Sequence, residues 1–391
     1  MSMIPITMEV FRSTIPMRSF KHAAAERNVS ENILVRVTFA DGSTGWGETL
    51  PRPYVTGETL ESVVEDLEHI IWPRWAGEDL MADGLTPVDI AEPIHNGRCI
   101  NAAIAAFDMA CMARLGDLPE VTSPEMLSEL SGRTQARREI DVRVSAVLGA
   151  NKPSKITRKL RIMRWGAGLD DVKLKLTGDD ATDATLVQTV YRSLRGAIAR
   201  GQSTLRVDVN GGWSAEETPE HIRALLPWGV CAVEQPTYCS AAELVELSRE
   251  CELPLIADES LLTMADAEVL LAEPERIWWN LRLSKNGGLV NTLKMAKLAG
   301  AHGVTFVLGC MVGETGILSA IQRRFLQLGA GPRFLEGNYG KFLIRDDITA
   351  PSLRFSYGGK IKTRREPGLG VEVRADKLAQ YAKLLFTLGV H

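Results

Sequence analysis

The chain has 391 residues, of which 45% are hydrophobic and 24% are charged. Such a chain is too long for one ordinary domain and short for three, and it has enough apolar residues for a large core. Its formal net charge of −4 argues against nucleic acid and membrane surfaces as partners. Neither a long apolar stretch nor a leader-like N-terminus is present, so we expect neither a membrane span nor a signal peptide.

The six cysteines lack the CxxC spacing of a structural zinc site. They lie in apolar surroundings, which is typical of reduced thiols in a core. We therefore expect a cytoplasmic protein. The positions are Cys99, Cys111, Cys231, Cys239, Cys251 and Cys310.

The N-terminal part is predicted to contain a β-hairpin. Ile33–Phe39 is rich in β-branched residues, which favour a strand. Asp41 and Gly42 are turn-forming residues, and Gly45–Glu48 continues as the second strand. The hairpin indicates that the chain begins with a small α+β unit.

Three helices are predicted outside the central part of the chain. Apolar residues at helical spacing predict a helix over Thr59–Trp72, which Pro73 ends. A second helix is predicted over Asn101–Leu115, with Gly116 as its stop. A third, Lys377–Leu388, lies in a tail that we expect to pack back onto the N-terminal unit.

From about Val142 the pattern changes to short apolar runs that alternate with helical stretches, which indicates βα units and a parallel sheet. Eight strands in about 200 residues favour a closed (β/α) barrel, for which about 250 residues are typical. An open doubly wound sheet is the alternative, but no G-x-G-x-x-G follows a first strand. The runs are Val142–Leu148, Val172–Leu176, Leu205–Val209, Val230–Glu234, Leu255–Asp258, Ile277–Leu281, Val304–Leu308 and Phe334–Leu335.

Three of these runs end in an acid: Asp208 in RVDVN, Glu234 in AVEQP and Asp258 in IADES, with separations of 26 and 24 residues. Side chains at the C-terminal ends of barrel strands converge on one mouth, so the acids are expected to lie together. Three carboxylates repel one another unless a cation joins them, and an all-oxygen set favours Mg²⁺ over zinc. Each acid alone could be a helix N-cap or a solvated loop residue, but three at consecutive strand ends indicate a metal site.

One βα unit upstream, the segment VKLKL places Lys173 and Lys175 on the same face of a strand. Two lysines that face into a barrel are costly unless they are used. We expect the neighbouring positive charges to lower their pKa values, so that one lysine can act as a base near neutral pH. A surface edge strand with solvated lysines is the alternative.

These residues together fit one chemistry. A carbon acid beside a carboxylate is very weakly acidic, and a metal ion on that carboxylate stabilises the enediolate that forms when the proton leaves. The reaction requires a metal ion, a base and cationic or hydrogen-bonding help. The sequence therefore predicts proton abstraction from a small carboxylate substrate.

At this point the residues resemble the enolase superfamily, in particular the muconate lactonizing enzyme subgroup of its mandelate racemase/muconate lactonizing enzyme family. The resemblance covers nearly the whole chain, and its motifs are specific because they occur in this order and spacing. They are KLK at 173–175, DVN at 208–210, EQP at 234–236, DES at 258–260 and KNGG at 285–288, with GWGE at 45–48 resembling the family's cap.

The resemblance implies an architecture. It is a (β/α)7β barrel of the TIM type, beneath an α+β capping domain that the C-terminal tail completes. The implied units are an N-terminal cap over residues 1–135, a catalytic barrel over 136–352, and a C-terminal segment over 353–391 that returns to the cap. The resemblance also implies a homo-oligomer of unknown number.

The resemblance also implies roles for individual residues. Lys175 is the expected base and Lys173 its electrostatic partner. Asn210 is expected to contact the metal ligands rather than the metal ion itself. The cap segments 16–27 and 51–56 match loops that close over the mouth and set specificity. The expected ligands of one Mg²⁺ per subunit are Asp208, Glu234 and Asp258, and the candidate substrate contacts in the cap are Phe20, His22, Tyr54 and Thr56.

The chain departs from the subgroup on the sixth strand. The second lysine expected two residues after Asn280 is replaced by Arg282, which stays protonated and is a poor base. An arginine there suits a fixed cation that pairs with the enediolate or with a second substrate carboxylate. Lys285 could act as the missing base only if the chain curls back; otherwise it is a lysine of the following loop.

Two further departures concern specificity. Dipeptide epimerases of the subgroup carry Asp-x-Asp near strand eight, whereas this chain has Glu336, Asn338 and Tyr339, so Glu336 becomes the candidate substrate contact there. Strand seven lacks the histidine of mandelate racemase-like members. Glu314 follows that strand and is placed to donate a proton or a hydrogen bond, unless it is a solvated loop acid.

The leading hypothesis is a one-base lyase, such as a dehydratase, or a cycloisomerase in which Lys175 takes the proton and Mg²⁺ and Arg282 stabilise the enediolate. A second hypothesis is a racemase or epimerase in which Arg282 or Lys285 serves the other face of the substrate. A third is a non-catalytic metal-binding or ligand-sensing scaffold. The sequence does not name the substrate.

Overall fold

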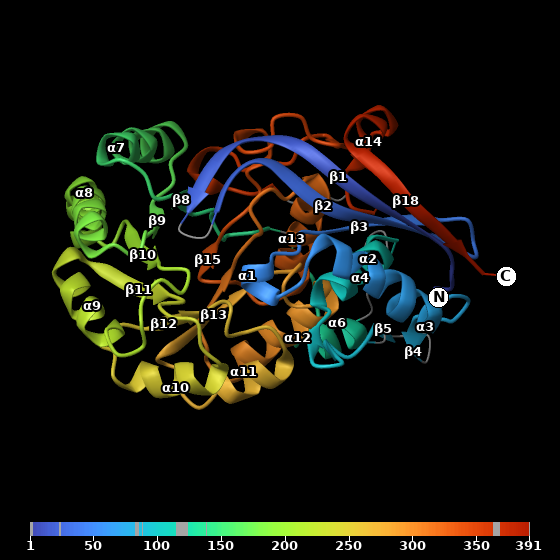
Figure 1. The fold of residues 1–391 in the computed structure, drawn as a ribbon, viewed down its shortest axis with the longest axis horizontal. Helices are drawn as coiled ribbons and strands as arrows, with labels where there is room; N and C mark the ends of the chain where they lie inside the picture. The colour runs from blue at the N-terminus through green and yellow to red at the C-terminus, as the bar shows by residue number, and fades with distance from the viewer. Residues whose placement is uncertain are drawn as a thin grey trace.

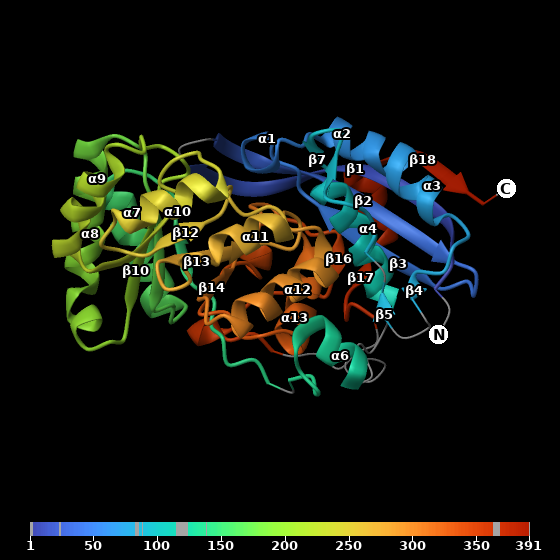
Figure 2. The same cartoon turned by 90° about the horizontal axis from the view of Figure 1, so that it is seen from below.

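The computed structural model describes residues 3–22, 25–82, 86–87, 89–114, 124–137, 139–362 and 368–390. Two sheets dominate the fold: an eight-stranded sheet of order β15-β14-β13-β12-β11-β10-β9-β8 and a four-stranded sheet of order β18-β1-β2-β3. Figure 1 shows the eight strands and their helices in one half of the molecule. The four-stranded sheet lies across the other half, where both chain termini are found (Figures 1 and 2).

The eight-stranded sheet is parallel throughout and closes into a barrel. A parallel bridge between Val144 and Leu335 joins its two ends, with the Ser145 amide 2.7 Å from the Leu335 carbonyl. The strands are β8 (Ala146–Leu148), β9 (Asp171–Lys175), β10 (Thr204–Asp208), β11 (Val230–Glu234), β12 (Leu255–Ala257), β13 (Ile277–Leu281), β14 (Phe306–Leu308) and β15 (Phe334–Leu335).

One helix follows each strand except the last, which confirms the predicted (β/α)7β barrel and excludes the open doubly wound sheet. The helices are α7 (Pro153–Arg161) with its π-helical continuation η2 (Ile162–Gly166), α8 (Asp180–Ala199), α9 (Thr218–Leu225) with η3 (Leu226–Trp228), α10 (Ala241–Arg249), α11 (Met264–Leu270), α12 (Gly288–Ala301) and α13 (Gly316–Leu328). They surround the strands as an outer layer (Figure 1).

The predicted runs locate all eight strands, and the first one begins later than predicted. Of Val142–Leu148 only the last three residues form β8. The preceding residues pair with the tail: Arg143 bridges to Lys360, and the Val144 amide donates to the Gly359 carbonyl at 2.9 Å. The tail therefore contacts the barrel before it reaches the four-stranded sheet.

The four-stranded sheet is antiparallel and consists of β1 (Pro5–His22), β2 (Ala25–Phe39), β3 (Thr44–Thr49) and β18 (Ala382–Gly389). The predicted hairpin is confirmed, because β2 pairs with β3 across a turn in which Gly42 has φ +82°. The other two strands were not predicted. The boundaries 135/136 and 352/353 between the units stay a prediction.

The buried face of β1 changes along the strand, which explains why the sequence did not show it. Met8 and Val10 pack in the main hydrophobic core. Phe11, Ile15 and Met17 pack in a second cluster, which includes a residue of α13. Because the buried alternate positions change between Val10 and Phe11, the strand has no single alternating pattern.

The helix predicted to stop at Pro73 continues to Trp75, so that prediction is wrong. It consists of α2 (Leu60–Asp66), a π-helical turn η1 (Leu67–Ile71) and α3 (Trp72–Trp75). Proline lacks an amide proton and crowds the preceding turn of an α-helix, and the wider π turn accommodates it. The next helix, α4 (Asn101–Arg114), agrees with prediction, and its expected stop at Gly116 lies outside the described residues.

The predicted tail helix Lys377–Leu388 is also wrong in its second half. A short helix, α14 (Ala375–Tyr381), is followed by the strand β18, which pairs with the edge of β1 from Ser13↔Ala382 to Thr7↔Gly389. Hydrophobic periodicity alone does not distinguish a short apolar strand from a helix. Here the edge of β1 is available for pairing, and residues 382–389 form a strand against it. The expected return of the tail to the N-terminal unit is confirmed.

The remaining elements are short. They are α1 (Pro53–Thr56), β4 (Met81–Ala82), β5 (Thr86–Pro87), β6 (Ile94–His95), β7 (Arg98–Cys99), α6 (Pro124–Ser131), η4 (Gly340–Phe342), β16 (Thr349–Ala350), η5 (Tyr357–Gly359) and β17 (Glu372–Val373). Within the described part of the chain, no helix is long and apolar enough to cross a membrane. Of the six cysteines, three are buried and three are partly exposed.

Buried hydrogen bonds attach β2 and β3 to the loops at the C-terminal ends of the barrel strands. Glu48 of β3 accepts from the amides of Thr315 and Leu318 at 2.9 and 3.0 Å, at the N-terminus of α13. Thr49 and Ser284 share a hydroxyl contact of 2.7 Å, which reaches the loop after β13. These contacts hold the four-stranded sheet over the barrel mouth.

Candidate active site

Charged residues replace apolar ones on the inward faces of neighbouring barrel strands. In the parallel register Lys175 of β9 pairs with Asp208 of β10, and Asp208 pairs with Glu234 of β11. Two residues lower, Lys173 pairs with Arg206. Alternate residues of a strand face the same side, so these positions form two charged layers inside the barrel. All five residues are buried.

Lys175 points into the barrel mouth and is 7% exposed. Its Nζ donates to Asp208 Oδ2 at 2.7 Å and to Asn210 Oδ1 at 2.8 Å. Asn210 has φ +50°, and its backbone amide donates to Asp208 Oδ1 at 3.1 Å. Because β9 is an interior strand with both lysines buried, the alternative of a solvated edge strand is wrong.

Lys173 is enclosed by carboxylates. Its Nζ lies 3.0 Å from Glu234 Oε1 and Oε2, 2.7 Å from Glu336 and 3.5 Å from Asp208. Burial alone would lower the pKa of Lys173, but the charges of these carboxylates outweigh burial and raise it. We predicted a lowered pKa, and the direction is the opposite. Lys173 is therefore a fixed cation.

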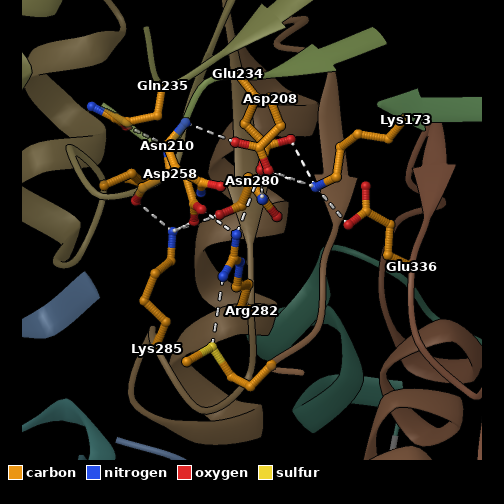
Figure 3. Close-up of polar contacts among 12 residues, drawn as sticks. Lys173, Asp208, Asn210, Glu234, Gln235, Asp258, Asn280, Arg282, Lys285 and Glu336 are labelled. Atoms are coloured by element: carbon orange, nitrogen blue, oxygen red, sulfur yellow. Dashed lines mark hydrogen bonds and ion pairs between the residues drawn. The ribbon is translucent and has the colours of Figure 1, made fainter. Parts of the chain in front are cut away.

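The three acids at the strand ends, Asp208, Glu234 and Asp258, are fully buried and turn toward one another (Figure 3). Burial alone would raise the pKa of Asp208, but the ammonium groups of Lys175 and Lys173 outweigh it and lower that pKa. For Glu234 burial prevails over Lys173, and the pKa rises to about 7. The acids therefore differ in how readily each carries a negative charge.

The guanidinium group of Arg282 lies among these acids (Figure 3). Its Nη2 contacts Asp258 Oδ2 and lies 3.5 Å from Glu234 Oε1, while Nη1 lies 3.7 Å from the Met311 sulfur. Burial opposes its charge, but Asp258 and Glu234 outweigh burial and raise the pKa of Arg282. Arg282 is thus a permanent cation that cannot serve as a base.

Lys285 curls back from the loop after β13 and reaches Asp258. Its Nζ donates to Asp258 Oδ1 at 3.0 Å, to the Asp258 carbonyl at 2.7 Å and to the Asn280 carbonyl at 2.8 Å. Burial lowers the pKa of Lys285. Three acceptors match the three hydrogens of its ammonium group, so the lysine fixes the position of Asp258.

Comparisons with known proteins agree with this geometry. The family model described as enolase C-terminal domain-like matches residues 156–377. The chain belongs to this enolase family. It is 26% identical over 378 residues to the L-Ala-D/L-Glu epimerase of Bacillus subtilis, which covers 94% of this chain and 96% of that protein. It is 27% identical over 384 residues to muconate cycloisomerase 1 of Rhodococcus opacus, with 97% and 98% covered.

A solved structure supports the same fold. Muconate lactonizing enzyme from Pseudomonas fluorescens, complexed with muconolactone, matches with a TM-score of 0.80 at 24% identity, covering 98% of this chain and 100% of that one. The resemblance to the enolase superfamily and its muconate lactonizing enzyme subgroup is therefore confirmed, and the relatives are enzymes, among them isomerases.

The enolase family implies a Mg²⁺ ion, and the donor chemistry of this chain fits one. Three buried carboxylates meet at neighbouring strand ends, and Glu259 adds two buried carboxylate oxygens that have no hydrogen-bond partner in the described part of the chain. Yet among the residues that the structure describes, no three His, Cys, Asp or Glu side chains are arranged to hold a metal ion. Lys173 bridges Asp208 and Glu234, and Arg282 bridges Glu234 and Asp258.

Glu314 lies in the loop after β14. Its Oε1 accepts from the Met311 amide at 2.6 Å. Burial raises the pKa of Glu314 to about 8, with Glu48 adding to the effect and Arg282 opposing it. The carboxyl group is therefore protonated at neutral pH, as a proton or hydrogen-bond donor requires. Its predicted role stays a prediction.

The substrate contacts predicted in the cap are described in part. Tyr54 and Thr56 belong to α1, with Tyr54 half-buried and Thr56 buried. The Thr56 hydroxyl accepts from the Glu58 amide at 3.4 Å. The backbone of Phe20 and His22 lies in β1, but their side chains are outside the described part of the structure.

Glu336 lies inside the barrel next to Lys173, and its predicted role as a substrate contact stays a prediction. Its carboxylate pairs with Lys173 at 2.7 Å and with Arg206 at 3.2 Å, and the residue is 3% exposed. Arg206 also stacks on the Phe334 ring, 4.0 Å from its centroid. Arg206 was missed in the sequence, although it stands two residues before Asp208 and so shares its face.

Two more residues at the mouth were missed. Asn280 Nδ2 donates to Glu234 Oε1 at 2.8 Å, and its position two residues before Arg282 was the available signal. Tyr238 follows β11, and its ring lies over Gly211, where a Cβ atom would approach it to 2.4 Å. Nearby negative groups, including Glu259, add to the effect of burial in raising the pKa of Tyr238. We therefore expect the Tyr238 ring to lie at the entrance of the site.

Proposed function

We propose that this chain abstracts the proton α to the carboxylate of a small substrate, with Lys175 as the base. The observation that carries the proposal is the buried Lys175 ammonium group at the barrel mouth, 2.7 Å from Asp208 and 2.8 Å from Asn210. These two acceptors fix the direction of Nζ. A base must lie within hydrogen-bond reach of the proton it takes, and the strand end provides that position.

The acids and the fixed cations complete the site. Asp208, Glu234 and Asp258 would hold one Mg²⁺ per subunit, and the ion would stabilise the negative charge that develops on the substrate carboxylate. Arg282 is a permanent cation at the same mouth and would pair with the enediolate or with a second carboxylate. Lys173, held by three carboxylates, would keep the charge around Lys175 constant.

With one base, the enediolate would lose a β-leaving group or open a lactone-type bond, so the reaction would be that of a lyase, such as a dehydratase, or of a cycloisomerase. Arg282 supports this choice because it cannot exchange a proton with the other face of the substrate. Glu314, with its raised pKa, would donate the proton that the leaving group or product requires. Tyr54, Thr56 and the cap would cover the substrate.

A racemase or epimerase is an equally supported alternative, because a relative that matches nearly the whole chain is an L-Ala-D/L-Glu epimerase. Lys285 reaches Asp258 inside the barrel and has a lowered pKa, as a second base would need. Against this role, all three of its hydrogens are used in hydrogen bonds. The stereochemical course of the reaction separates the two candidates.

The test is substrate-dependent exchange of the α-hydrogen in heavy water, followed by NMR over a panel of acid-sugar, amino-acid, dipeptide and lactone carboxylates. We expect exchange with the wild type and a loss of at least about 10²-fold in Lys175→Ala. Lys155→Ala, an exposed lysine of α7, is the matched control and should exchange normally. Equal exchange by Lys175→Ala and wild type would refute the assignment.

The configuration of the exchanged product completes that test. Retention or elimination supports a one-base reaction, whereas inversion supports the epimerase. No exchange with any member of the panel would favour a non-catalytic metal-binding or ligand-sensing scaffold.

A further inference from the structure

Arg282 lies where two of the proposed metal ligands meet. Its Nη2 contacts Asp258 and lies within 3.5 Å of Glu234, so one nitrogen satisfies both carboxylates (Figure 3). Both contacts come from Nη2, which the rigid planar guanidinium group holds at the end of the side chain, whereas an ammonium group is a compact point charge. The replacement of the usual lysine by arginine therefore places a bridging cation between the acids.

The other end of Arg282 is held weakly. Among the described residues, Nη1 contacts the Met311 sulfur at 3.7 Å, and the buried Nε finds no hydrogen-bond partner there. Lys173, the second bridging cation, differs: it is fully buried and contacts three carboxylates at 2.7 to 3.5 Å. Of these two cations, Arg282 is therefore the one that can leave the acids at the smaller loss of other contacts.

We propose that Arg282 is a built-in competitor of the metal ion: it occupies the Asp258–Glu234 pair, and its side chain must turn away from that pair when a divalent cation binds. A dication and a guanidinium group cannot share two carboxylates without strong repulsion. The protein therefore binds its metal more weakly than a chain with a neutral residue at this position. The inference rests on the proposed metal site of Asp208, Glu234 and Asp258.

The acids keep partners when Arg282 is removed. Asp258 retains Lys285 at 3.0 Å, and Glu234 retains Lys173 and the Asn280 amide at 3.0 and 2.8 Å. Neither carboxylate is left as an isolated buried charge, which is the usual reason for failure of such variants. Arg282→Gln is therefore expected to fold.

The experiment measures binding of Mn²⁺ alone, without substrate, from the electron paramagnetic resonance signal of free Mn²⁺. Arg282→Gln should bind at least about tenfold more tightly than the wild type, with Arg282→Lys between them. Met311→Leu changes the neighbour at the far end of the guanidinium group without changing charge, so its affinity should equal that of the wild type. Asp208→Asn tests whether the ion uses the acids.

The outcomes separate the inference from the function on which it rests. If Asp208→Asn abolishes binding but Arg282→Gln binds no more tightly than wild type, the competition is refuted and the metal site stands. If neither wild type nor Arg282→Gln binds Mn²⁺, both are refuted. Should circular dichroism show that Arg282→Gln is unfolded, the test passes to Arg282→Lys, and equal affinity of this variant and the wild type overturns the inference.

Discussion

The inward charges of the barrel occur at alternate positions of single strands. Lys173 and Lys175 share one face of β9, and Arg206 and Asp208 share one face of β10. Opposite charges meet in the register at Lys175 and Asp208, 2.7 Å apart, whereas Lys173 stands beside Arg206. A buried ion remains charged only when partners replace its water. The buried carboxylates of Glu234 and Glu336 from other strands provide these partners for Lys173.

The raised pKa of Glu314 leads to a prediction about a single residue. Because burial raises its pKa to about 8, the carboxyl group is protonated below that pH and ionised above it. If it donates a proton during turnover, kcat should fall as pH rises past about 8, and Glu314→Gln should lose both that limb and about 10²-fold or more of the rate. A pH–rate profile of both proteins checks this.

The groups near Glu314 include Glu48 from the cap, Arg282 from the barrel, Cys310, Tyr339 and the Met311 amide. None of these changes its protonation between pH 8 and 9, because burial raises the pKa of Cys310 and of Tyr339 well above the ordinary value, the pKa of Arg282 is also raised, and that of Glu48 rises only to about 7. An unchanged limb in Glu314→Gln would assign the pH dependence to another group.

Residues with a strong local signal could be predicted from the sequence, and those defined by distant partners could not. Asp208, Glu234 and Lys175 stand at the ends of short predicted strands, where a charged residue facing the barrel mouth is conspicuous. The ion pair of Glu336 with Arg206 could not be predicted, because the two residues are 130 positions apart and only the closed barrel brings them together. The raised pKa of Lys173 has the same origin.

At the scale of elements, close packing between the cap sheet and α4 depends on a missing side chain. A Cβ atom at Gly47 of β3 would lie 1.9 Å from the backbone carbonyl oxygen of Ala106 in α4. Backbone cannot move aside as a flexible side chain can. The helix and the strand therefore approach each other only because residue 47 is glycine.

Gly47→Ala should consequently lower the free energy of unfolding by about 3 kcal/mol, the upper end of the range for overpacking. Gly300→Ala is the matched control: it adds the same methyl group within α12, where nothing lies within 4 Å. That variant should gain about 1 kcal/mol from helix propensity. Urea unfolding measures both, and equal stabilities of the two variants would contradict the packing argument.

Whether a segment forms a helix or a strand was predictable where a single hydrophobic pattern runs through the whole segment. Ile277–Leu281 and Val230–Glu234 were located without error because buried parallel strands read as short apolar runs. The change of buried face between Val10 and Phe11 concealed β1, and the edge of β1 then determined the conformation of residues 382–389. A strand that forms only because it can pair with a neighbouring edge has no recognisable strand pattern in its own sequence.

At the scale of the molecule, the two ends of the chain complete one sheet. β18 covers the outer edge of β1, and the same sheet is attached through Glu48 and Thr49 to the loops of the barrel mouth. Figure 1 shows β18 beside β1 at the end of the molecule where both termini lie. The structure of the cap sheet over the site therefore depends on β18, the last strand of the sequence.

Ending the chain at Tyr381, which removes β18, should therefore expose the long edge of β1. Most β18 side chains are exposed, so the main loss is of backbone pairing rather than of apolar burial. An uncovered edge strand pairs with other molecules, and we expect a lower melting temperature and aggregation. Scanning calorimetry and light scattering measure both, with a chain that ends at Gly389 as the control. A truncated protein that stays at the oligomeric state and melting temperature of this control would show that β18 does not protect the edge.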